Sequence, residues 1–180
     1  IYAARGVSET QLSMALPGLL KPNFDQLNAA LELLEKCLVE DKRILIVGDF
    51  DADGATASAV AIKALKLMGA KHVDFLVPNR FKHGYGLSPE IVKEAKDDKE
   101  PDLIITVDNG ISSNEGTELA RSLAIDVIIT DHHLPPNKLP NANAIINPNL
   151  RGCDFPSKNL AGVGVSFYLF SSLKTFLVNQ

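Results

Sequence analysis

The stretch "RILIVGDFDADGATASAVAIKALKLMGA", residues 43–70, decides the fold because it places a buried strand directly before a helix. Residues 43–50 contain an apolar run without polar alternation, which predicts a strand covered on both faces. Residues 54–70 are rich in alanine and other apolar residues and predict a helix that ends at Gly69. The same alternation of strand and helix continues along the chain after this unit.

The remaining elements follow the same pattern. We predict strands over 72–77, 102–107, 125–130 and 143–148, and helices over 88–98, 112–124 and from about 162 onward. Buried strands that alternate with helices indicate an α/β fold, a mostly parallel sheet with helices on both faces. Before residue 43, helices are predicted over 8–16, with Ser8 as N-cap, and over 23–40. We therefore expect an N-terminal helical segment over 1–42 and a main domain over 43–180.

Composition and charge set limits on the class of protein. The chain has 180 residues and a net charge of −4, which argues mildly against a nucleic-acid-binding surface. Two divalent cations would balance that charge, so a polyanionic substrate stays open. Cys37 and Cys153 form no framework and are expected to be reduced thiols of a cytoplasmic protein. We expect no membrane association, because the sequence shows neither a signal peptide nor an apolar run long enough to span a membrane.

Both ends of the sequence suggest a longer natural chain. The sequence begins at Ile1, and residues 160–180 are still apolar and periodic where it stops. No glycine C-cap closes this last helix. We therefore expect the main domain to be truncated at its C-terminus.

Polar residues follow four of the predicted strands directly. They are Asp49, Asp51 and Asp53 after the first strand, Asn79 and Arg80 after the second, Asp108 after the third, and Asp131, His132 and His133 after the fourth. Right-handed crossovers bring the carboxyl ends of parallel strands to one edge of the sheet, where ligands bind. The sequence therefore predicts a functional site at that edge. For Asp108 or Asp131 taken alone, a role as helix N-cap is the competing interpretation.

Three aspartates within five residues repel one another unless a cation is present. An EF-hand calcium loop is a poor match, because its twelfth position, counted from Asp49, is Val60 where a bidentate Glu is required. A phosphatase with an Asp-x-Asp-Gly-Thr strand end is a second candidate, but Ala55 stands where the Thr is needed. The remaining interpretation is a site for two metal ions.

The two-metal interpretation assigns a ligand role to four residues. In an extended chain, Asp51 and Asp53 would point the same way about 6.5 Å apart and reach different ions of a pair about 3.5 to 4 Å apart. Asp108 would bridge both ions, and His132 would add a nitrogen ligand. Carboxylate and imidazole ligands together suit Mn²⁺ and tolerate Mg²⁺.

Three further features have two interpretations each. Arg80 is a candidate phosphate clamp or a partner in a surface salt bridge. His83 is a candidate phosphate contact or a solvated loop residue. Gly162 and Gly164 begin the last helix, whose N-terminus could hold an anion, or they allow close packing.

Four blocks of sequence, taken together, resemble the DHH phosphoesterase superfamily, and within it the bacterial single-strand-specific exonucleases. The blocks are "GDFDADG", "VPNRFKHGYGLSPE", "TVDNGIS" and "ITDHHLP", followed by "INPNLRGCDFPSKNLAGVGV". The resemblance covers nearly the whole chain, so residues 43–180 are expected to be a DHH phosphoesterase domain. It implies a Mg²⁺- or Mn²⁺-dependent 5′-to-3′ exonuclease on single-stranded DNA, acting in recombination and repair. It also implies a single-strand-binding protein and a helicase as partners.

The resemblance also implies roles for individual residues. Asp51 and Asp53 match the first metal-binding motif, Asp108 the bridging aspartate and His132 a metal ligand. His133 matches a histidine near the scissile phosphate, and Asp49 and Asp131 take auxiliary catalytic roles. The superfamily's fourth metal-binding aspartate, a second core domain and an OB-fold are absent from this sequence, which puts the activity of this chain alone in doubt.

Two rival functions follow from the same residues. One is a phosphoesterase of the same superfamily that acts on pyrophosphate, a dinucleotide or a cyclic dinucleotide. The other is a non-catalytic relative that serves as a scaffold in replication. Such a relative would have lost metal ligands, whereas every ligand of the covered motifs is present here.

Overall fold

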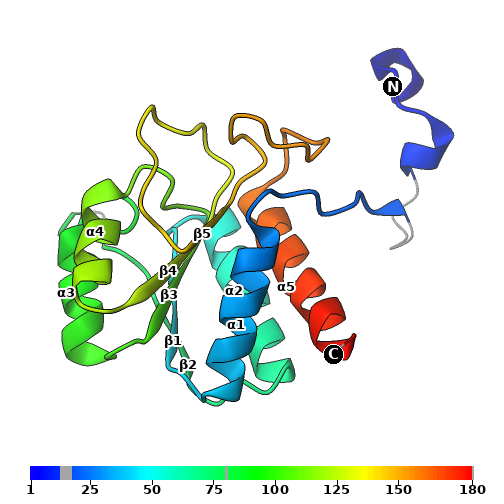
Figure 1. Cartoon of the computed structure of the whole chain (residues 1–180). Helices are drawn as coiled ribbons and strands as arrows, with labels where there is room; N and C mark the ends of the chain where they lie inside the picture. Colours follow the sequence, from blue (N-terminus) through cyan, green and yellow to red (C-terminus); the bar gives the residue numbers. More distant parts are fainter. Residues whose placement is uncertain (13–17, 80, 180) are drawn as a thin grey trace.

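A computed structural model describes residues 1–12, 18–79 and 81–179 of the chain. Its centre is a parallel sheet of five strands in the order β2-β1-β3-β4-β5 (Figure 1). The strands are Ile44–Gly48 (β1), Val73–Leu76 (β2), Leu103–Val107 (β3), Asp126–Thr130 (β4) and Ala144–Ile146 (β5). The predicted α/β class and the parallel sheet are confirmed.

The strands differ in burial according to their place in the sheet. Every residue of β1 and β3 is buried, as their continuous apolar sequences predict. The sequence prediction was wrong for β2, which was expected to be buried on both faces. β2 lies at the edge of the sheet, and its Asp74 and Phe75 are exposed.

Helices cover both faces of the sheet, as predicted (Figure 1). They are Leu27–Val39 (α1), Ala52–Leu67 (α2), Pro89–Asp98 (α3), Asn114–Ser122 (α4) and Gly162–Val178 (α5). Successive residues of a strand point to opposite faces. Ile44 and Ile46 accordingly pack in the core with α1, α2 and α5, whereas Leu45 and Val47 pack in a second core with α3 and α4.

In the described part of the segment before the sheet, two short 3₁₀ turns precede one long helix. The turns are Ala3–Arg5 and Glu9–Leu12, and part of the helix predicted over 8–16 falls on 13–17, outside the described residues. α1 buries Leu31 and Leu34 in the same core as the sheet. The division of the chain at residue 43 stays a prediction. Among the described helices, none has the length and apolar character needed to cross a membrane.

Candidate active site

The predicted site residues gather where the sheet reverses its strand order. β1 is followed in the chain by β2 on one side and later by β3 on the other, so the crevice between β1 and β3 is a topological switch point. Asp49 and Asp108 lie there, one residue past each strand. Their backbone N–H groups donate to the carbonyls of Val107 and Thr130, at 3.3 and 3.0 Å. The ends of the strands thus hold both aspartates at the mouth of the crevice.

Asp108 is the most constrained of these residues. Its side chain is buried, and its backbone takes the left-handed conformation, with φ 63°, that Asp tolerates better than most residues. Among the described residues, its Oδ1 atom accepts no hydrogen bond, although Nε2 of His132 lies 3.1 Å away. Burial, together with the charges of Asp53 and Asp51, raises the pKa of Asp108 to about 7. A buried carboxylate beside two others, with an oxygen that accepts no hydrogen bond from the described residues, is an environment that a cation would stabilise.

Two groups of candidate ligand atoms share Asp108. One consists of Asp49, Asp51 and Asp108, and the other of Asp108, His132 and His133. Within each group the ligand atoms lie within 4.8 Å of one another. Oxygen and imidazole ligands around a shared carboxylate fit two divalent ions, so the residues present fit the predicted pair of metals. The competing interpretation of Asp108 as a helix N-cap is wrong, because its carboxylate faces this cluster.

The geometry predicted for Asp51 and Asp53 was wrong. The chain is extended only as far as Asp51, which is the N-cap of α2 and accepts a hydrogen bond from the N–H of Gly54 at 2.9 Å. Asp53 already lies in the first helical turn, so the two side chains do not share one face of a strand. The favourable N-cap explains why the helix begins at Ala52, earlier than predicted.

Asp53 lies against the start of α5. Its two carboxylate oxygens accept hydrogen bonds from the N–H groups of Gly162 and Val163, at 2.7 and 2.8 Å. The anion predicted at this helix N-terminus is therefore a side chain of the protein itself. Each oxygen keeps a further lone pair, and Nε2 of His132 lies 3.8 Å from Oδ2, so the ligand role of Asp53 stays a prediction.

Gly162 is required by the close approach of Asp108 to α5. A Cβ atom at residue 162 would lie 2.3 Å from Oδ1 of Asp108. Close packing, one of the two interpretations of this glycine, is thus confirmed alongside the anion contact. α5 and the crevice are in this way fixed to each other at the candidate ligands.

Asp131 holds the loop that carries the two histidines. Its Oδ1 atom accepts hydrogen bonds from the backbone N–H groups of His132 and His133, at 2.7 and 3.1 Å, and lies 2.7 Å from Nδ1 of His133. Its Oδ2 atom accepts from the N–H of Ile111 at 2.9 Å. No helix follows Asp131, so the N-cap interpretation is wrong here too. Its catalytic role stays a prediction, and what the contacts show is that it orients His133.

His133 is biased toward its charged form. Burial lowers the pKa of its imidazole, but the hydrogen bond with Asp131 and the charges of Asp131, Asp108 and Asp49 outweigh burial and raise the pKa overall. With Nδ1 turned to Asp131, Nε2 is the nitrogen that can meet a ligand. A cationic ring there would suit an anionic ligand.

Two asparagines that sequence reasoning missed also hold the histidine loop. The side-chain N–H groups of Asn147 and Asn149 donate to the carbonyls of His133 and His132, at 2.9 and 2.6 Å. Asn147 is buried, and its Oδ1 accepts from the N–H of Asn149 at 2.8 Å. The only sequence signal was their position just after a strand, in "INPN".

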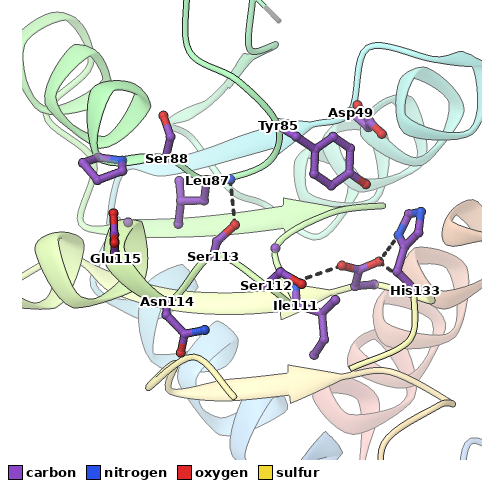
Figure 2. A pocket seen from close by; sticks show the side chains of 14 residues that line it. Asp49, Tyr85, Leu87, Ser88, Ile111, Ser112, Ser113, Asn114, Glu115 and His133 are labelled. Carbon is purple, nitrogen blue, oxygen red and sulfur yellow. Dashed lines mark hydrogen bonds and ion pairs between the residues drawn. The ribbon is translucent and has the colours of Figure 1, made fainter. Parts of the chain in front are cut away.

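Tyr85 is a second residue that sequence reasoning missed. Its hydroxyl donates to the backbone carbonyl of Asp108 at 3.3 Å, and its ring makes edge contacts with Phe50 and His133. Burial and the charge of Asp49 raise the pKa of its phenol strongly, so it stays a neutral donor. Figure 2 shows Tyr85, Asp49 and His133 together at one end of a pocket of about 680 Å³.

The structure describes only one of the two predicted substrate-binding residues. Arg80 lies outside the described residues. His83 is not a solvated loop residue, because Nε2 lies 3.1 Å from Oε2 of Glu94 and Nδ1 accepts from the N–H of Asn79 at 3.2 Å. A role for either residue in binding phosphate stays a prediction.

Comparison with protein families gives one match over most of the chain. Residues 43–179 match the model described as the DHH family, N-terminal domain. Over the whole chain, 54% of residues are identical to the single-stranded-DNA-specific exonuclease RecJ of Escherichia coli. A relative of the same name from Bacillus subtilis is 42% identical over 80% of the chain. The chain spans only 31% and 18%, respectively, of the lengths of these two proteins.

Solved structures give the same result. A structure of exonuclease RecJ bound to manganese superposes with a TM-score of 0.76 and 37% identity, over 86% of this chain and 38% of that one. RecJ from Thermus thermophilus in complex with Mn²⁺ gives a TM-score of 0.79 and 32% identity, over 98% of this chain and 24% of that one. The described fold is thus that of the corresponding part of these proteins.

Proposed function

The chain belongs to the DHH family, and on that premise we propose that it is the metal-binding part of an exonuclease that cleaves single-stranded DNA. The observation that carries the proposal is the pair of ligand groups that share Asp108 at the switch point of the sheet. The names of the relatives, and the manganese in the two solved structures, support this substrate and this cofactor.

We propose Mn²⁺ or Mg²⁺ as the cofactor, two ions to a site. Asp49, Asp51, Asp108 and His132 would hold them, with Asp53 reaching the site from the first turn of α2. Such a pair of ions lowers the pKa of a bound water and stabilises the charge that develops on the phosphate. Asp108 belongs to both ligand groups, and its Oδ1, which accepts no hydrogen bond from the described residues, would be available to a cation.

Other residues of the site would position the substrate. The imidazole of His133 is held at Nδ1 by Asp131 and lines the pocket, so its Nε2 would donate a hydrogen bond to a phosphate oxygen. Tyr85 fixes the carbonyl of Asp108 and closes the site on one side. Asn147 and Asn149 keep the histidine loop in place while the phosphate binds.

The test compares cleavage by the natural full-length protein and by its Asp108→Ala variant. We expect Mn²⁺-dependent release of nucleotides from a 5′-labelled single strand, and loss of cleavage in the variant with an unchanged circular dichroism spectrum. Full cleavage by the variant would refute the bridging role. Faster turnover of dinucleotides than of long single strands would favour the small-substrate phosphoesterase instead.

The cellular setting is proposed from the resemblance alone. It comprises 5′-to-3′ polarity, a role in recombination and repair, a cytoplasmic location, and partnership with a single-strand-binding protein and a helicase. Cleavage of strands blocked at one end or the other tests the polarity. Protection of only the 3′-blocked strand would contradict it.

A further inference from the structure

The pocket beside the candidate metal ligands is larger than a phosphate needs. It encloses about 680 Å³, in the range of sites that hold small molecules. Asp49, Asp131 and His133 line one end, and Ser88 and Glu115 line the other, between the starts of α3 and α4 (Figure 2). A substrate whose phosphate lay at the metal ligands would therefore have room to extend along it.

The walls of the pocket are held in place by hydrogen bonds. The N–H of Leu87 donates to Oγ of Ser113 at 3.0 Å, and the N–H of Ile111 donates to Asp131. Residue 86 must be a glycine for this contact to form. Its φ is 73°, and a Cβ there would lie 2.8 Å from Oγ of Ser113. The loops after β2 and β3 thus form a preformed pocket.

The lining combines flat apolar surface with neutral polar groups. Tyr85, which is half exposed, supplies the main apolar side-chain surface, whereas Leu87 and Ile111 also line the pocket but are almost fully buried. Ser112 and Asn114 belong to the same lining. An aromatic ring next to aliphatic side chains favours stacking of a planar ring system. Hydroxyl and amide groups along the same wall suit the polar edge of such a ring.

The side-chain charges of the described lining disfavour a second phosphate. Among the residues that the structure describes, the lining includes three carboxylates, those of Asp49, Glu115 and Asp131, and neither lysine nor arginine. Of the described lining residues, His133 alone can become cationic, and it lies at the end next to the metal ligands (Figure 2). A phosphate at the far end would meet the carboxylate of Glu115, and no described cationic side chain lines that end. A neutral group is therefore the better ligand.

We propose that this pocket holds the base and sugar of the nucleotide whose phosphate lies at the metal ligands. The inference rests on the proposed function and adds a contact to the nucleoside, independent of base identity. Stacking against Tyr85 accepts any base, which suits an enzyme that removes nucleotides one after another.

The test measures binding, so that it does not depend on turnover. In the natural full-length protein with Mn²⁺, calorimetry compares the affinity for dAMP with that for 2-deoxyribose 5-phosphate, which lacks the base. We expect dAMP to bind at least tenfold more tightly. Ser112→Phe, which fills the pocket from an exposed position, should abolish the preference. Ser122→Phe, at the other end of α4, is the matched control and should keep it.

Equal binding of the two ligands to the unaltered protein would overturn the proposal. So would a full preference for dAMP in Ser112→Phe. A protein that kept the preference for dAMP but cleaved no single strand would contradict the exonuclease and leave the nucleoside pocket standing. The two proposals are therefore separable.

Discussion

At the scale of single residues, the site is a balance between buried negative charge and the groups that hold it in place. The sequence rule that polar residues follow parallel strands identified Asp49, Asp108 and His132. It could not predict the left-handed backbone of Asp108 or its unpaired Oδ1, because both depend on contacts with β4 and α5. It missed Asn147 and Asn149. Their side chains donate to backbone carbonyls, and every residue has a carbonyl, so the sequence does not show which one is bound.

The raised pKa of Asp108 predicts how a substitution changes stability without metal. The pKa in the folded protein, about 7, lies above the ordinary value of 3.8 for an aspartate. The contribution of this carboxyl to stability is therefore full below pH 3.8 and is lost as pH rises through 7. Without metal, Asp108→Asn should raise Tm by at least about 3 °C at pH 8.5 and by much less at pH 5. An equal change at both pH values in calorimetric scans would contradict the assignment.

A substitution of Asn147 should weaken metal binding even though Asn147 is not one of the candidate metal ligands. Removal of the amide in Asn147→Ala frees the carbonyl of His133 and loosens the histidine loop. Loss of such supporting contacts typically weakens metal binding about 10- to 100-fold. Mn²⁺ titration followed by electron paramagnetic resonance measures the change, with Asn28→Ala on the exposed face of α1 as the control. A change of less than about twofold in the Mn²⁺ affinity of the folded variant would show that the histidine loop does not depend on Asn147.

At the scale of elements, the helices and strands were predictable from the sequence. The residue at which a helix begins and the contacts between distant elements were not. Continuous apolar runs placed β1, β3 and β4 because burial on both faces leaves a plain sequence signal. The start of α2 was placed too late, because the N-cap at Asp51 competes with continued extension of the strand. Asp53 as the partner of α5 lay beyond prediction, since the two are 109 residues apart.

The contact between Asp53 and α5 predicts a loss of stability. Asp53→Ala removes the acceptor for two N–H groups at a helix N-terminus, where a carboxylate also complements the helix dipole. We expect a loss of about 1–2 kcal/mol in urea unfolding at pH 5.5, comparable to the loss of a good cap. At that pH Asp108, with its pKa of about 7, is mostly neutral, so that relief of its repulsion with Asp53 does not offset the loss. Asp97→Ala, an exposed aspartate of α3, should change stability by less than about 0.5 kcal/mol. Equal stability of the two variants would contradict a stabilising contact.

At the scale of the whole molecule, the strand order creates the site. Because β1 lies between β2 and β3, the crevice opens beside Asp49 and Asp108, and helices on both faces fix it. The sequence predicted the parallel sheet and the edge that carries the site. It did not predict the pocket, because loops that follow β2, β3 and β4 line it together. Sequence reasoning thus identified most of the candidate metal ligands and missed the room for the substrate beside them.

The most direct test of the central claim is a calorimetric titration of this chain with Mn²⁺ at pH 7.5. We expect two ions to bind. Asp108→Asn should weaken this binding at least about 100-fold, because Asp108 belongs to both ligand groups. Asp74→Asn, an exposed aspartate of β2, should bind as the unaltered chain does. An unaltered chain that binds no Mn²⁺, or an Asp108→Asn variant that binds it equally well, would contradict the two-metal site.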